Sequence, residues 1–175
     1  LFTEILLEGT AGNNGWYRSD VKVSLTVHSG SGGIGVGTTE YSFDGQNWSA
    51  YSAPLTANSE GTTRIYCRTT GGGRYVEPTK DKDIKIDKTP PVITGAATTQ
   101  PNAKGWYKTD VTVSFTATDE GSGSDTVTPD TVINTDGTNQ SVVGTATDMA
   151  GNTASFTVSG INIDKGVPTV NLYTR

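Results

Sequence analysis

Apolar and polar residues alternate with a period of two along two nearly identical stretches of the chain. The first, "GWYRSDVKVSLTV", begins at Gly15, and the second, "GWYKTDVTVSFTA", begins at Gly105. A period of two indicates a β-strand with one buried face. We therefore expect two equivalent strands, each with three apolar side chains pointing into a core: Val21, Val23 and Leu25 in the first, and Val111, Val113 and Phe115 in the second.

The repeat continues to the end of each expected module. "DIKIDKTPPVI" at residues 83–93 is echoed by "GINIDKGVPTV" at residues 160–170. Pro90 and Pro91 lack backbone donors, so a sheet cannot continue through them. We therefore predict two domains, residues 1–88 and 89–165, and interpret residues 166–175 as the start of a following module or a tail.

Turn sequences rich in Gly, Asn and Asp separate short apolar runs throughout both halves, and no sustained helical periodicity is present. Each half offers about seven short strands within fewer than ~100 residues, which is typical of an immunoglobulin-like sandwich. The expected fold class is all-β, with two tandem immunoglobulin-like β-sandwiches and almost no helix.

Three sequence pieces resemble the bacterial Ig-like repeats of secreted and cell-surface proteins: "GWY" with the following "DVTVSFTATD", the hairpin "GTATDMAGN" at 144–152, and the linker "IDKTPP" at 86–91. In the first half, "EYSFDGQNWSAYSAPL" and "EGTTRIYCRTTGGGRYVEP" resemble a related variant. The resemblance implies an extracellular or cell-surface location and a non-catalytic architectural or adhesive role.

Composition and charge exclude several classes of function. The net charge of −5 opposes binding to nucleic acid or to an anionic membrane, and no apolar run is long enough to insert into a bilayer. Cys67 and His28 are the only residues of their types, so neither an internal disulfide nor a zinc site of the usual Cys and His spacing can form. We expect His28 in an exposed loop and Cys67 packed near the core, and we predict that the chain is not an enzyme.

Acidic residues of the second module form the candidate metal site. The loops "TDEGSGSD" and "TDMAGN" should meet at the end of the sandwich where the chain enters, which also receives Asp87 from the linker. Crowded carboxylates repel one another unless a cation neutralises them, and Ca²⁺ takes six to eight oxygen ligands. The sequence therefore offers a Ca²⁺ site, with ordinary turn formation as the alternative; its candidate residues are Asp119, Glu120, Asp125 and Asp148.

Two aromatic residues in an apparent insertion of the first module provide a second candidate site. Trp48 and Tyr51 are flanked by Asn and Gln, and exposed aromatic rings stack on sugars, although single surface aromatics need no ligand. Two functional hypotheses follow. The first is a tandem stalk or scaffold whose partners are neighbouring modules of the same chain and a cell-surface glycan or protein ligand. The alternative is a carbohydrate-binding accessory module of a secreted polysaccharide-degrading enzyme or adhesin.

Overall fold

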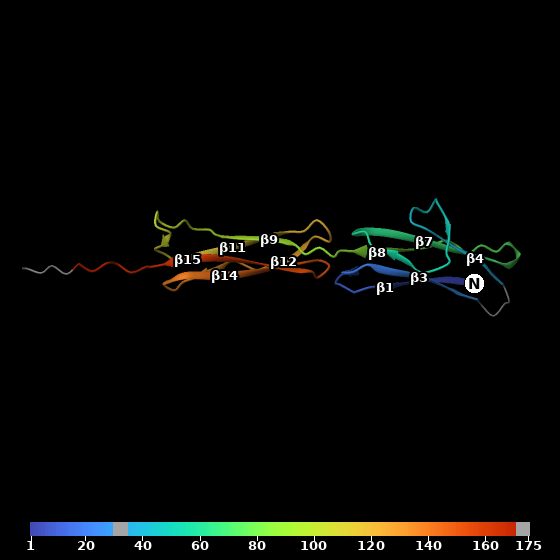
Figure 1. Cartoon of the computed structure of the whole chain (residues 1–175), viewed down its shortest axis with the longest axis horizontal. Helices are drawn as coiled ribbons and strands as arrows, with labels where there is room; N and C mark the ends of the chain where they lie inside the picture. Colours follow the sequence, from blue (N-terminus) through green and yellow to red (C-terminus); the bar gives the residue numbers. More distant parts are fainter. Residues whose placement is uncertain (30–34, 171–175) are drawn as a thin grey trace, which may run out of the picture. The chain divides into compact units, whose positions relative to one another are not determined.

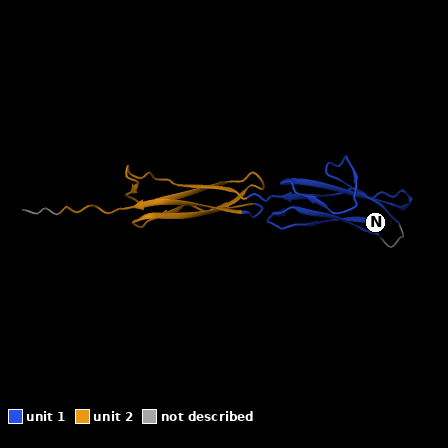
Figure 2. Ribbon diagram, viewed as in Figure 1, with its two compact units in different colours: residues 1–89, 149–152 blue, residues 90–148, 153–175 orange. Residues whose placement is uncertain are grey.

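The structure, a computed structural model, describes residues 1–29 and 35–170 (Figure 1). It divides the chain into two compact units, which Figure 2 colours separately: unit 1 is Leu1–Thr89 with Met149–Asn152, and unit 2 is Pro90–Asp148 with Thr153–Arg175. The main division falls immediately before the two prolines. Residues 171–175, within the expected following module or tail, lie outside the described residues.

The described residues of unit 1 form two sheets and a single 3₁₀ turn, Gly72–Arg74. One sheet has the order β1-β3-β6 and the other the order β2-β8-β7-β4-β5. Their bounds are β1 Phe2–Glu8, β2 Trp16–Tyr17, β3 Val21–His28, β4 Val36–Ser42, β5 Ser49–Ala50, β6 Leu55–Ala57, β7 Gly61–Gly71 and β8 Lys80–Ile86.

Unit 2 also consists of two sheets, ordered β13-β11-β9 and β10-β15-β14-β12. Their bounds are β9 Val92–Ala97, β10 Trp106–Tyr107, β11 Val111–Thr118, β12 Ser124–Val127, β13 Thr131–Ile133, β14 Gly137–Asp148 and β15 Thr153–Ile163. The described part of the chain contains no α-helix, and none of its helical turns could span a membrane. The expected all-β fold of two immunoglobulin-like sandwiches in tandem is confirmed.

The alternating apolar residues face the cores as the sequence predicts. Of the three in β3, Val21 and Val23 are fully buried and Leu25 is 7% exposed; their counterparts in β11 are buried to a similar degree. The intervening Lys22 is exposed, whereas its counterpart Thr112 is half-buried. Each core joins both sheets of its unit, because residues of β7 and β8 pack on β3, and residues of β14 and β15 pack on β11.

The core of unit 2 contains a phenylalanine where the core of unit 1 has a leucine, and two glycines make room for the larger ring. Phe115 occupies the position of Leu25 and lies against Gly95 of β9 and Gly144 of β14. A Cβ atom added at either glycine would lie 2.4 Å from the Cδ1 atom of Phe115. The phenyl ring therefore fills the space that side chains at these two positions would occupy.

Candidate functional site

The chain leaves unit 1 through a lysine that is held by two segments of that unit. The Nζ atom of Lys88 donates hydrogen bonds to Oδ1 of Asp20 at 2.8 Å and to the carbonyl oxygen of Asn58 at 3.0 Å. The preceding Asp87 uses its carboxylate to accept a hydrogen bond from the Thr89 amide at 3.1 Å. These contacts set the direction in which the backbone leaves the last strand.

Unit 2 ends with the same arrangement. The Nζ atom of Lys165 donates to Oδ1 of Asp110 at 2.9 Å and to the carbonyl oxygen of Asn134 at 2.7 Å. The carboxylate of Asp164 accepts from the Gly166 amide at 2.9 Å. Because the two units repeat these contacts, we call the paired set the exit clamp: Lys88, Asp20, Asn58 and Asp87 in unit 1, and Lys165, Asp110, Asn134 and Asp164 in unit 2.

The Trp-Tyr pairs place the exit clamp next to the core. They form the two-residue strands β2 and β10, which pair in parallel with the final strands β8 and β15. The carbonyl oxygens of Tyr17 and Tyr107 accept hydrogen bonds from the amides of Asp87 and Asp164 at 2.9 and 3.0 Å. Both tyrosine side chains pack on their cores. The repeated aromatic pair thus anchors the outgoing chain.

The two tryptophans of these pairs have different surroundings. The Nζ atom of Lys85 lies 6.0 Å from the centre of the Trp16 ring. Trp106 instead lines a hollow of about 440 Å³ beside the outgoing chain at Asp164–Pro168. Packing on the core is therefore the role of the tyrosines, while both tryptophans stay half-buried at the end of the unit.

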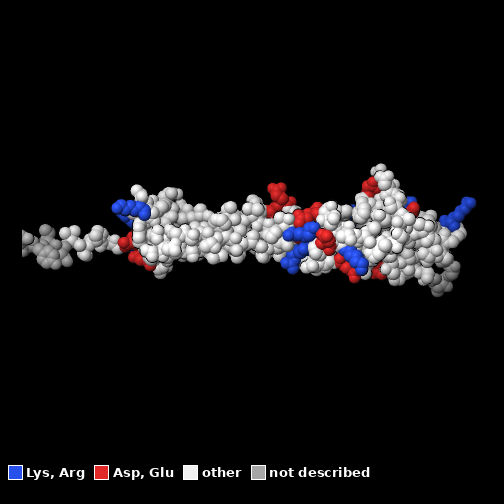
Figure 3. Space-filling view, in the orientation of Figure 1, with Lys and Arg blue, Asp and Glu red and all other residues white. Residues whose placement is uncertain are grey.

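Most acidic residues of unit 2 lie in connections or at strand ends. Strands β9, β11, β13 and β15 contain no Asp, Glu, Lys or Arg, and β14 carries only its last residue, Asp148. The face of unit 2 drawn in Figure 3 is accordingly almost without charge along its strands. Charged ligands would therefore meet this unit at its ends.

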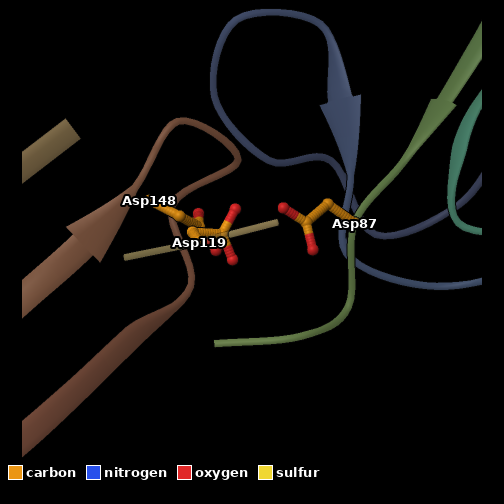
Figure 4. A group of neighbouring side chains, drawn as sticks. All are labelled: Asp87, Asp119 and Asp148. Carbon is orange, nitrogen blue, oxygen red and sulfur yellow. The ribbon is translucent and has the colours of Figure 1, made fainter. Parts of the chain in front are cut away.

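Asp119 and Asp148 are brought together as the sequence predicts. Carboxylate oxygens of the two residues lie within 4.8 Å of one another, and Figure 4 shows both carboxylates side by side, with Asp87 of unit 1 labelled as well. Asp148 is fully buried. Oxygens bound to one Ca²⁺ at about 2.3–2.6 Å can be separated by such a distance. This pair is the part of the candidate Ca²⁺ site that the structure of unit 2 assembles.

The other two candidate ligands are not members of this close group. Glu120 is exposed, and Asp125 is the exposed residue at an irregularity in the pairing of β12 with β14. Oδ1 of Asp119 also has an ordinary role in a turn, because it accepts hydrogen bonds from the amides of Gly121 at 3.1 Å and Gly123 at 2.7 Å. Calcium binding at Asp119, Glu120, Asp125 and Asp148 therefore stays a prediction.

The two aromatic residues proposed for sugar binding both have partners within unit 1. The guanidinium carbon of Arg68 lies 4.0 Å from the centre of the Trp48 ring, and Arg68 also pairs with Glu40 at 2.9 Å. The hydroxyl oxygen of Tyr51 accepts a hydrogen bond from the Leu25 amide at 3.1 Å. Tyr51 thus supports the fold, whereas Trp48 is a half-buried ring with Arg68 stacked against it.

The single histidine and the single cysteine of the chain both lie on strands of unit 1. His28 is the exposed last residue of β3 rather than a loop residue; its ring stacks on Phe2 at 4.6 Å and contacts Glu4 at 3.0 Å. Cys67 is fully buried on β7, and burial raises the pKa of its thiol to about 11. A buried, protonated thiol is a poor nucleophile.

A buried polar network around Glu77 was missed from the sequence. Glu77 lies in the connection between β7 and β8 and is only 3% exposed. It contacts Thr3, which is 1% exposed and stands on β1 in phase with the apolar Ile5 and Leu7. The available signal was this polar residue at an inward position of an otherwise apolar strand face.

Comparison with known proteins finds likeness among solved structures but not among family models or curated proteins. No family model matches the sequence, and no curated protein matches it. Among solved structures, the chain is similar to the fibronectin(III)-like modules of CbhA from Clostridium thermocellum, with 14% sequence identity, a TM-score of 0.42, and coverage of 99% of this chain and 100% of that chain.

Proposed function

We propose that this chain is a non-catalytic structural segment of a larger extracellular protein, in which tandem sandwiches act as a stalk or scaffold. The exit clamp is the observation that carries the proposal. A spacer must control the direction in which the chain leaves each module, and the same lysine, aspartate and carbonyl contacts meet this need at the end of both units.

The energetics favour a directional role for the clamp over a purely stabilising one. A solvent-exposed ion pair contributes about 0–1 kcal/mol to folding. Lys88 and Asp20 are partly exposed, so their pair adds little to the stability of unit 1. Three hydrogen-bonded contacts on consecutive residues nevertheless restrict the backbone from Asp87 to Thr89, which reduces the range of directions available to the next residue.

Spin-label distance measurements test the proposal. Cysteines placed at the exposed Thr62 of unit 1 and Thr157 of unit 2 carry the labels, because native Cys67 is buried. A stalk predicts a narrow distance distribution that broadens in Lys88→Ala. Lys22→Ala is the matched control, since it removes another exposed ion pair, with Glu8, that is not part of the exit clamp. A broad distribution in the unsubstituted protein would contradict the stalk.

A carbohydrate-binding accessory module is the second candidate. The observation that favours it is the stacking of Arg68 on the half-buried Trp48 ring, because an aromatic ring restrained by a neighbouring side chain loses less entropy when a ligand binds. Retention on insoluble polysaccharides that is lost in Trp48→Ala but kept in Phe43→Ala would support this function. Phe43 is the matched control because it is a 44% exposed aromatic residue in the same connection. Passage through every polysaccharide without retention would exclude it.

A further inference from the structure

The first strand of unit 1 is tied to the opposite sheet by a buried carboxylate. Glu77 accepts hydrogen bonds from the amide of Thr3 at 2.7 Å and from its hydroxyl at 2.6 Å. The Nζ atom of Lys80, on β8, lies 2.9 Å from Glu77 and donates to the carbonyl oxygen of Thr3 at 3.0 Å. Thr3 is thus held through its side chain and both of its backbone polar groups.

The hydroxyl groups around this carboxylate extend the network to two more strands. Because the Thr3 hydroxyl donates its single proton to Glu77, the Thr69 hydroxyl at 2.6 Å must donate to Thr3. Thr69, on β7, is 2.9 Å from the hydroxyl of Thr39 on β4. The network therefore joins β1 of one sheet to β4, β7 and β8 of the other.

The residues on either side of Thr3 are held on the outer face of the strand. The Phe2 ring stacks on the His28 ring at 4.6 Å and lies 4.5 Å from Nζ of Lys80. Glu4 contacts His28 at 3.0 Å. Three consecutive residues at the start of β1 therefore carry side-chain contacts to β3, β8 and the β7–β8 connection.

Unit 2 shows that the fold does not require this network. In the pairing of β1 with β3, Thr3 stands opposite Val27; in the pairing of β9 with β11, Ile93 stands opposite Ala117, the equivalent position. Ile93 is 7% exposed and packs in an apolar core. Since well-packed apolar residues stabilise a core as well as a buried ion pair does, stability alone does not explain Thr3 and Glu77.

We propose that Glu77 is a tension anchor that fixes the start of β1 to the body of unit 1. The inference rests on the proposed stalk function, in which a pulling force entering unit 1 at its N-terminal end reaches Phe2, Thr3 and Glu4 first. Hydrogen bonds to a charged group are short-ranged and strong, and the three bonds at Thr3 must break together before the strand can slide. Apolar contacts between a strand and its neighbours resist sliding less sharply because they are not directional.

The protonation state of Glu77 determines whether the anchor is engaged. Burial alone would raise the pKa of Glu77, but the hydrogen bonds from the Thr3 hydroxyl, Lys80 and the Thr3 amide outweigh it and leave the pKa below its ordinary value. Because the pKa of Glu77 is lower in the folded state, the ionised carboxylate stabilises folded unit 1 fully above the ordinary glutamate pKa, about 4.3. This stabilisation is lost as the pH falls through the lower folded-state pKa. Other ionisable groups near the network include Lys80 on β8, Cys67 on β7, Glu4 on β1 and His28 on β3.

Single-molecule pulling of the whole chain from its two ends tests the anchor. Each unit gives its own extension step, and unit 2, which has Ile93 in place of Thr3, serves as the internal reference. We expect Glu77→Gln to raise the unfolding rate of unit 1 under constant load by at least tenfold and to leave unit 2 unchanged. Glu8→Gln is the matched control, because Glu8 lies on the same strand in an exposed pair with Lys22. An unfolding rate for Glu77→Gln equal to that of the unsubstituted protein overturns the anchor.

A pH series on the unsubstituted protein keeps the test decisive where Glu77→Gln fails to fold. The anchor predicts that the resistance of unit 1 to force stays constant down to about pH 4.3 and then falls more steeply than that of unit 2 as the pH is lowered further. If the resistance of unit 1 falls just as steeply in a His28→Gln variant, the His28–Glu4 pair is not the source of the pH dependence. Equal pH dependence of the two units overturns the anchor, while the spin-label distances report on the stalk independently of this result.

Discussion

Replacing Gly95 with alanine should destabilise unit 2, although alanine is normally the better strand residue. Gly95 does not have a positive φ, so its backbone suits alanine, and losing a glycine from a strand would by itself stabilise the fold by about 0.5–1 kcal/mol. The new Cβ atom, however, would lie 2.4 and 2.6 Å from two ring carbons of Phe115 and 3.1 Å from a methyl group of Val158.

The clash outweighs the gain because the phenyl ring is buried in the close-packed core of unit 2 and cannot move aside without displacing its neighbours. On β14 the same ring fills the space beside Gly144, 2.4 Å from where a Cβ atom would stand. Overpacking a close-packed core costs about 1–3 kcal/mol. We therefore expect a net loss of about 1–2 kcal/mol in the free energy of unfolding of unit 2. At about 4–8 °C per kcal/mol for a domain of this size, the melting temperature should fall by about 5–15 °C.

Calorimetry of the full chain provides the assay, with the transition of unit 1 as the internal reference. The matched double variant Gly95→Ala/Phe115→Leu reproduces the side chain at the equivalent position of unit 1, Leu25, and makes room for the new methyl group. We expect the double variant to be at least about 1 kcal/mol more stable than the sum of the two single changes predicts, as in other contacting pairs. An unchanged melting temperature for Gly95→Ala, or strict additivity in the double variant, would refute the reasoning.

Three further predictions concern the cores, the acids and the buried thiol. Val23→Ala should destabilise only unit 1, and Val113→Ala only unit 2, each by about 1–3 kcal/mol in calorimetry, because both remove fully buried methyl groups; a shift of the other unit's transition would contradict the separation of the cores. Calcium at a hundredfold excess over Kd should stabilise unit 2 by about 2.7 kcal/mol and leave unit 1 unaffected, and Asp148→Asn should abolish this response. Identical melting temperatures with calcium and with chelator would mean that the candidate calcium ligands are ordinary turn residues. The stability of unit 1 should fall as the pH rises from about 9 towards about 11, because the thiol of Cys67 loses its proton in the unfolded state but keeps it in the folded state. Urea unfolding at both pH values measures this loss, with Cys67→Ala as the control. An equal loss of stability in Cys67→Ala would assign the effect to other groups.

The candidate sites were predictable to different degrees. The crowding of Asp119 and Asp148 followed from their places in two loops at one end of a sandwich, whereas Glu120 and Asp125 are near in sequence but not in the close group. Sequence spacing places a loop but does not orient each side chain within it. Tyr51 is similar: its neighbours in sequence gave no indication that its hydroxyl would reach the Leu25 amide on β3.

The sequence by itself determined the all-β class, the two repeated strands and the residues that face each core, because a period of two depends only on the geometry of an extended chain. The repeated aspartate and lysine before the prolines likewise predicted the end of each module. Only the tertiary structure decided that Thr3 meets Glu77, 74 residues away, and that Phe115 packs against glycines from two different strands. These contacts depend on which strands become neighbours and how the two sheets face each other, and a local pattern of apolar and polar residues carries no information about either.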